Sequence, residues 1–420
     1  MSNPAQAGET RLGRSGPVRA ESLLRAAAVR SHAEQLMALA MRGELAHFTW
    51  HPERMDAAAA YVADTIRQRH PDLRVPVHSR WRHFETGGVD RFASLLGPLH
   101  ATPQERARIA IDLVVPSVLL DAGAGAQWRY ADTVHGQVLA RSEGLGVASF
   151  ALFASGALSD DPSHPLRTDA AALRRVTAQR LAGAFQVTPA NPLVGIDGRL
   201  ALLSNLGDAM RAAPQVFADP ERPGSLRLGR LFDHLQAQSG SEGIGAAEVL
   251  ANLLHLFSPV WPGRLTLDGV NLGDCWRHPA TDDGYAPFHK LTQWLTYSLL
   301  EPLEQGGLRV TGLDALTGLP EYRNGGFLLD IGLLQPREAA LAQRPLAVDS
   351  EAVVEWRALT VAALDRLADA VRAQLGVRAE DFPLARVIEG GTWFAGRRIA
   401  AERRADGGPP LRIVSDGTVF

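Results

Sequence analysis

A carboxylate follows the most apolar segment of the chain. Ile109–Leu120 is almost wholly apolar, and Asp121-Ala-Gly-Ala-Gly125 comes directly after it. If this segment is a buried helix, Asp121 lies at the end that carries partial negative charge, where an anion is disfavoured, and burial disfavours the charge again. Carboxylates in such places often bind a ligand or move a proton. The alternative is a structural Asp bonded to backbone N–H groups of the Gly-rich turn.

A second group of polar residues falls on one side of a predicted helix, Phe288–Glu304. At 100° per residue, the apolar residues of this segment share one face, and Lys290, Gln293, Tyr297 and Glu301 fall within a narrow arc opposite. This arc is either a plain solvent face or a row of donors and acceptors that binds a polar ligand.

A buried arginine is expected in the helix predicted over Glu351–Leu375. Arg357 falls between Val361 and Leu364 on the apolar face, so its guanidinium must reach solvent or a buried anion. Its planar donors suit a carboxylate or a phosphate. The partner is either substrate or a structural acid such as Asp121 or Glu389.

Three predicted loops or turns combine charged and aromatic residues. In the first, which begins at His78, Arg80 and Arg82 could receive an anion, although a solvated loop is the simpler interpretation. In the second, Glu321, Tyr322 and Arg323 precede Asn324-Gly325, a strong turn signal. In the third, which begins at Glu389-Gly-Gly, Thr392 is the expected N-cap of a helix over 393–404 that contains Arg397, and such helix starts attract anions.

The rest of the chain predicts a mainly α protein. Further helices are expected over Glu21–Met41, Pro52–Arg69, Pro103–Leu120, Glu143–Phe153, Gly198–Met210 and Ala246–Phe257. Short strands are expected in Arg264–Val270, around the hairpin dipeptide Asp268-Gly269, and in Gly326–Leu334 and Leu411–Val414. Strands do not alternate with helices, which argues against a doubly wound sheet. We therefore expect a compact multi-helix domain with small β hairpins.

Length and composition limit the function classes. A chain of 420 residues forms one large domain or two closely packed ones, and we expect a disordered tail over 1–18 and a single domain over 19–420. The net charge of −3 and the absence of a basic block argue against nucleic-acid binding. One cysteine, Cys275, excludes a disulfide framework. With no signal sequence and no apolar run that could span a bilayer, we expect a soluble cytoplasmic protein without a membrane contact.

Several of these segments together resemble the uracil-catabolism family of fungi and bacteria, a family defined as a domain of unknown function. The matching segments run from residue 78 to the last residue: HSRWRHFETGGVDR, LLDAGAGAQWRY, RSEGLGVASF, LGDCWRH, PFHKLTQWLTYSLLEPL, LTGLPEYRNGG, VEWRALTVAALD, EGGTWFAGRRIA and SDGTVF. The resemblance implies a role beside a uracil phosphoribosyltransferase and a ring-opening enzyme similar to cyclohydrolase II. Those enzymes would make a ribosylurea-type product, so we infer a third step that separates urea from the ribose phosphate, with contact to these pathway enzymes.

A weaker similarity points the same way. FHKLTQWLTYSL is similar to a segment of the queuosine-salvage nucleoside hydrolases, which implies a helical core like that of DNA glycosylases. Where those hydrolases carry an Asp shortly before the Gln of this segment, this chain has Phe288, so no catalytic role is transferred.

Cleavage of a ribosidic C–N bond assigns roles to these residues. The oxocarbenium-like transition state needs a carboxylate, a donor for the leaving nitrogen and a cationic pocket for phosphate. Asp121 is the expected carboxylate, with Glu321 and Asp274 as alternatives. The remaining candidates bind substrate: Lys290, Arg323 and Arg397 hold phosphate; Gln293, Asn324 and Tyr322 bind urea or ring amides; Trp128 forms a wall; Arg357 and Glu389 orient their neighbours; and Arg80, Arg82, His83, His289, Tyr297 and Thr392 complete the set.

Two rival functions stay open. An amidohydrolase acting on a ring-opened ureide would require a metal or an activated nucleophile, and His78, His83, His278 and His289 are the histidines that could meet in space. A binding or channelling subunit would require no catalytic carboxylate. The leading hypothesis requires neither cofactor nor metal, and its ligand is a phosphorylated riboside.

Overall fold

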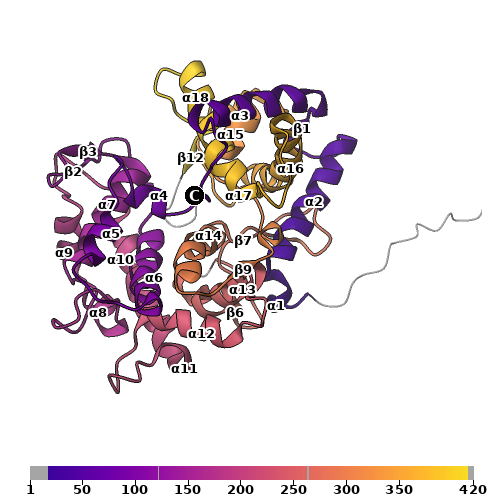
Figure 1. The fold of residues 1–420 in the computed structure, drawn as a ribbon. Coiled ribbons are helices and arrows are strands. Elements are labelled where there is room, and N and C mark those ends of the chain that lie inside the picture. The colour runs from indigo at the N-terminus through magenta and orange to yellow at the C-terminus, as the bar shows by residue number, and fades with distance from the viewer. Residues whose placement is uncertain (1–17, 122, 263, 415–420) are drawn as a thin grey trace, which may run out of the picture.

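Two large hydrophobic cores, built on different sets of helices, organise the computed structural model, whose fold is drawn in Figure 1. The structure describes residues 18–121, 123–262 and 264–414. The predicted N-terminal tail therefore lies outside the described residues except for Val18, as does the C-terminal SDGTVF segment. The described residues are mainly helical, as predicted.

The helices are α1 (Ala20–Leu23), α2 (Ala26–Arg42), α3 (Met55–Arg69), α4 (Trp81–Phe84), α5 (Arg91–Leu96), α6 (Pro103–Leu119), α7 (Arg141–Ala154), α8 (Ala170–Arg175), α9 (Ala178–Ala184), α10 (Ile196–Ala212), α11 (Pro214–Phe217), α12 (Leu231–Gln238), α13 (Ala246–Phe257), α14 (Lys290–Gln305), α15 (Tyr322–Asp330), α16 (Glu351–Leu375), α17 (Leu384–Val387) and α18 (Trp393–Arg403). Every helix in the described ranges is too short or too polar to cross a bilayer.

Strands occur only as short pairs within the described residues. Four pairs are antiparallel: β1 (Phe48–Trp50) with β10 (Leu334–Pro336), β2 (Tyr130–Asp132) with β3 (Gln137–Leu139), β5 (Thr266–Leu267) with β6 (Val270–Asn271), and β7 (Cys275–Arg277) with β8 (Tyr285–Pro287). Two pairs are parallel: β4 (Ile244–Gly245) with β9 (Val310–Thr311), and β11 (Leu346–Ala347) with β12 (Ile413–Val414). The predicted hairpin at Asp268-Gly269 is β5–β6.

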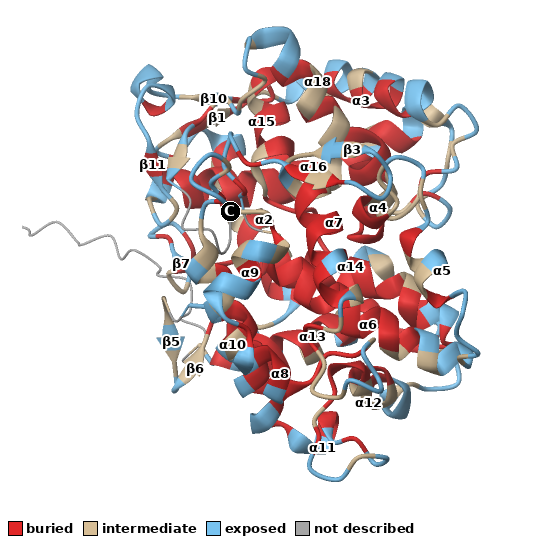
Figure 2. Ribbon diagram, turned by 90° about the vertical axis from the view of Figure 1, so that its left-hand side faces the viewer, coloured by how far each residue is buried: buried red, intermediate tan, exposed pale blue. Residues whose placement is uncertain are grey.

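The first core lies among α6, α7, α10, α13 and α14, and the second among α2, α3, α15, α16 and α18. Figure 2 shows buried residues running through α6, α13 and α14. α6 begins as its sequence predicts, because Pro103 follows Thr102, whose hydroxyl accepts the N–H of Glu105 at 3.2 Å. Gly376, at φ 70°, ends α16. These caps place the long helices where the apolar periodicity predicts them.

Two predicted turns are helical in the structure. Asn324-Gly325 lies inside α15, because the Glu321 carboxylate caps this helix by accepting the N–H groups of Arg323 and Asn324 at 2.9 and 2.6 Å. The predicted strand over Gly326–Leu334 is therefore wrong except at its last residue, where β10 begins. Thr392 is not an N-cap, since its backbone is helical and a π-helix over Ile388–Thr392 continues into α18.

Candidate functional site

A cavity of about 370 Å³ lies between the two cores. The first core contributes Asp121 after α6, residues of α7 and residues of α14. The second contributes the start of α15, Trp393 of α18 and the chain around Gly408. Pockets between packed units are a common place for small-molecule sites.

Asp121 is held at the α6 end of this cavity by an arginine. Its Oδ1 lies 2.8 Å from Nη1 of Arg80, whose side chain is fully buried, whereas the Asp121 side chain keeps 9% exposure toward the cavity. Arg80 Nε also donates to the Ser117 hydroxyl at 2.7 Å. Arg199 donates to the backbone carbonyls of Leu120 and Val194 and so satisfies the negative end of α6. The negative charge of Asp121 and the partial negative charge at the end of α6 are therefore compensated by the buried guanidinium groups of Arg80 and Arg199.

Glu321, Lys290 and Arg323 are further charged residues that line the cavity. Burial raises the pKa of the Glu321 carboxyl, although its two backbone donors and Lys290 oppose the shift. Burial lowers the pKa of the Lys290 ammonium, on which Glu321 and Asp121 both act with the opposite sign. The cavity thus combines two carboxyl groups with cations that can receive an anion.

Aromatic rings complete the wall. Trp294 lies 6.2 Å from His78 and 5.8 Å from His83 between ring centroids, and Trp393 lies 6.3 Å from His78. Burial, together with the Arg80 charge, lowers the pKa of His83 well below its usual value, so this imidazole is neutral. Tyr322 also lines the cavity. Flat rings beside charged groups suit a planar polar substrate.

A glycine allows α4 to reach the cavity. A Cβ on Gly146 of α7 would lie 2.6 Å from the Cβ of His83 and 3.5 Å from the guanidinium carbon of Arg80. Only a residue without a side chain permits this approach. The RSEGLG segment therefore has a packing role that positions both His83 and Arg80.

The structure brings six of the predicted site residues to the cavity. They are Asp121, Glu321, His83, Lys290, Tyr322 and Arg323. Arg80 and Glu389 do not line the cavity, but each bonds to a residue that does. Arg80 pairs with Asp121, and Glu389 Oε2 forms a 2.6 Å hydrogen bond with His78 Nδ1.

Arg357 finds a structural acid, as one alternative expected, but the partner is Asp274 rather than Asp121 or Glu389. The two side chains make a paired contact, with Nη1–Oδ1 and Nη2–Oδ2 both at 2.8 Å, and both are buried. Burial would raise the pKa of Asp274, but the Arg357 guanidinium and hydrogen bonds from Trp276 and the Lys290 backbone hold it well below its usual range. Asp274 thus anchors the start of α14 instead of lining the cavity.

Other predicted residues bond within the protein rather than line the cavity. The α14 arc does not act as one row: Lys290 lines the cavity, whereas Gln293 and Tyr297 are buried and bond to Thr317. Asn324 donates to the Leu319 carbonyl and accepts from Thr392. The remaining contacts are Trp128 Nε1 to the Phe185 carbonyl, His289 Nε2 to the Leu23 carbonyl, Arg82 to Glu301, and Arg397 to Glu143.

Trp294, Arg141 and Trp393 are among the cavity residues that the predicted set lacked. Trp294 lies one turn after Lys290 on the same side of α14, so helical spacing from Lys290 could have found it. Arg141 and Trp393 begin α7 and α18, and no local pattern distinguishes them. The four predicted histidines do not form a common site: His78 and His83 line the cavity, whereas His278 and His289 do not.

Comparisons with known proteins agree along nearly the whole chain. A family model described as "Protein of unknown function (DUF1688)" matches residues 22–420. The chain is 38% identical over 400 residues to "Protein urg3" of Schizosaccharomyces pombe, covering 93% of this chain and 96% of that protein. It is 39% identical over 412 residues to "Uracil catabolism protein 4" of Lachancea kluyveri, covering 90% and 93%.

Proposed function

The chain belongs to the DUF1688 family, and from this premise we propose that it acts in uracil catabolism as an N-ribosyl hydrolase that releases urea from a ribosylurea phosphate. The name of the Lachancea kluyveri relative supports the pathway. The observation that carries the reaction is the shared cavity, which is lined by Asp121 together with Lys290, Arg323 and several aromatic rings.

The proposed reaction is a hydrolysis at the anomeric carbon. Water adds to C1′ of the ribose, the C1′–N bond breaks with its electron pair going to the urea nitrogen, and that nitrogen takes a proton. Asp121 stabilises the positive charge that develops on the sugar. Glu321, whose carboxyl pKa burial raises, supplies the proton to the leaving nitrogen, and the proton lost by the attacking water then returns to the Glu321 carboxylate.

Lys290 and Arg323 would bind the phosphate, while Trp294 and Tyr322 contact the ribose and the planar urea group. Arg323 Nε is buried without a hydrogen-bond partner, and a phosphate oxygen would supply an acceptor. The cavity volume of about 370 Å³ is within the range of small-ligand sites.

The test is to incubate purified protein with ribosylurea 5-phosphate and measure urea and ribose 5-phosphate, then repeat with uridine nucleotides and measure free uracil. Release of equal amounts of urea and sugar phosphate supports the proposal. Release of ammonia instead would favour the amidohydrolase. Saturable binding without turnover would favour a binding or channelling subunit.

A matched pair of arginine variants tests the phosphate assignment. Arg323→Met should raise KM for the phosphorylated substrate, because it removes a cavity cation. Arg82→Met is the control, since Arg82 pairs with Glu301 away from the cavity lining. Equal effects of the two variants would contradict the assignment.

A further inference from the structure

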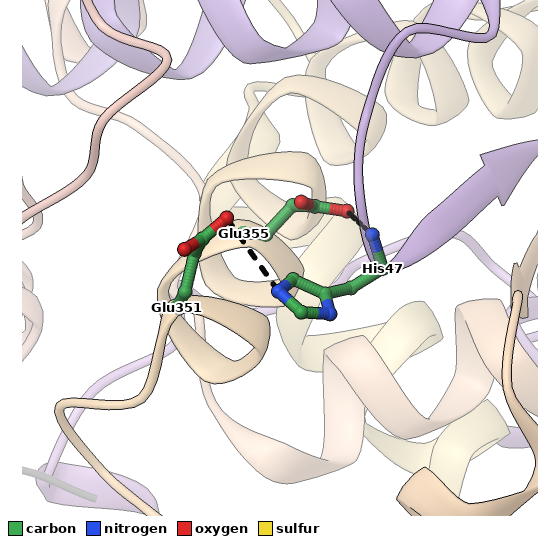
Figure 3. Close-up of side chains that lie close together, drawn as sticks. All are labelled: His47, Glu351 and Glu355. Carbon is green, nitrogen blue, oxygen red and sulfur yellow. Dashed lines mark hydrogen bonds and ion pairs between the residues drawn. The ribbon is translucent and has the colours of Figure 1, made fainter.

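His47, Glu351 and Glu355 form a cluster outside the cavity. The imidazole and carboxylate atoms that could bind a metal all lie within 4.8 Å of one another. Among the described residues, this is the group of three His, Cys, Asp or Glu side chains whose ligand atoms lie this close together. Figure 3 shows the His47 imidazole directed to the Glu351 carboxylate, and the Glu355 carboxylate beside the backbone nitrogen of His47. None of the three lines the cavity, so their arrangement has no explanation in the proposed reaction.

The elements that position the cluster come from distant parts of the sequence. Glu351 and Glu355 lie one turn apart at the start of α16, while His47 directly precedes β1. His47 Nε2 lies 3.6 Å from Glu351 Oε1, and the backbone N–H groups of His47 and Phe48 donate to Glu355 Oε1 at 3.1 and 2.8 Å. A ligand bound here would join the β1 strand to the first turns of α16.

Two buried atoms near the cluster lack a partner. Glu355 is fully buried, and its Oε2 has no hydrogen bond within the protein. A buried acceptor left in this way loses its hydrogen bonds to water without replacing them. The positive end of the α16 dipole accounts for Glu351 in the first turn. The dipole does not account for the second carboxylate, that of Glu355, which lies deeper in the protein and has one oxygen without a hydrogen bond.

His278 supplies the second such atom. It is buried, its Nε2 has no partner, and Glu351 and His47 are the charged groups that act on it. Its Nδ1 accepts the backbone N–H of Ala280 at 3.2 Å, which places the imidazole proton on Nε2. His278 therefore carries a buried donor without a partner, and it is not one of the proposed metal ligands.

We propose that His47, Glu351 and Glu355 bind a divalent transition-metal ion, with Zn²⁺ as the best-suited ion. One imidazole nitrogen and two carboxylate oxygens are ligands that Zn²⁺ accepts, and a water completes its tetrahedron. Imidazole disfavours Mg²⁺ and Ca²⁺ as the occupant. Tetrahedral ligands around Zn²⁺ lie roughly 3.3 Å apart, so side chains whose ligand atoms lie up to 4.8 Å apart must close around the ion. Those of His47 and Glu351 can, because both are partly exposed.

The test is a titration of the metal-stripped, untagged full-length protein with Zn²⁺ by isothermal titration calorimetry and thermal unfolding. We expect one Zn²⁺ per chain. At a hundredfold excess of Zn²⁺ over Kd, we also expect a melting temperature about 3 °C higher. Mg²⁺ should produce neither effect. The absence of stoichiometric Zn²⁺ binding would overturn the proposal.

Single variants locate the ion. Glu351→Gln should weaken Zn²⁺ binding by at least about tenfold, which reduces the thermal shift at the same Zn²⁺ concentration by at least about half, and this variant should fold because Glu351 is partly exposed. Glu53→Gln is the matched control: its carboxylate lies 2.9 Å from His51, but this exposed pair has no third ligand. Wild-type affinity in Glu351→Gln, or a loss of binding in Glu53→Gln, would show that Zn²⁺ binds elsewhere.

Discussion

Replacing Asp121 by Asn separates a catalytic role from a structural one, because the structure pairs this carboxylate with a buried guanidinium. The substitution leaves Arg80 charged and without its anion in a fully buried place. Removing one partner of a buried ion pair costs about 3–5 kcal/mol. For a chain of this length the entropy of unfolding is roughly 0.9 kcal/mol/K, so the melting temperature should fall by about 3–6 °C.

The effect on catalysis should be larger and of a different kind. Loss of the group that stabilises the developing positive charge should reduce kcat/KM for ribosylurea 5-phosphate by at least about a hundredfold. Urea release must be measured well below the melting temperature of the variant, with circular dichroism as the control for folding.

The double variant Arg80→Met/Asp121→Asn makes the distinction. It removes both charges together, and Ser117 keeps its 2.6 Å hydrogen bond to Ser149 when Arg80 is lost. At least half of the lost stability should return, because no unpaired charge stays buried, whereas turnover should stay at the level of the single variant. If turnover returned together with stability, or if Asp121→Asn kept wild-type kcat/KM, the catalytic assignment would be refuted.

Three further results are expected. Burial lowers the pKa of Lys290 from 10.5, so its positive charge is lost at a lower pH than usual. In the wild type, KM for the phosphorylated substrate should therefore rise in the alkaline range when it is measured against pH. In Lys290→Arg, KM should stay flat over the same range. Asp274→Asn should lower the free energy of unfolding in a denaturant titration by about 3–5 kcal/mol by leaving Arg357 buried and unbalanced; an unchanged midpoint would exclude this pairing. Gly146→Ala should cost about 1–3 kcal/mol in the same titration, because its Cβ would meet His83, whereas Gly198→Ala, which has open space around it, should not destabilise the protein.

The helices that form the cores follow from local sequence. α13 and α16 begin and end at the predicted residues, and α6 differs by one residue, because apolar periodicity and end signals act over a few neighbouring positions. The same periodicity placed Arg357 on a buried face and so predicted a buried anion beside it. Local patterns misled at Asn324, where the Glu321 carboxylate caps a helix that includes the turn dipeptide, and at Thr392, which lies inside a continuous helical stretch.

Which charged groups meet was decided by the tertiary structure. Arg357 and Asp274 are 83 positions apart, and Asp121 reaches Arg80 only after α4, α6 and α7 have packed. The sequence predicted that Asp121 and Arg357 each carry a costly charge, because burial follows from their apolar neighbours. It could not identify their partners, because a charge is compensated by whatever group packing brings within a few ångströms, and no local pattern records that distance.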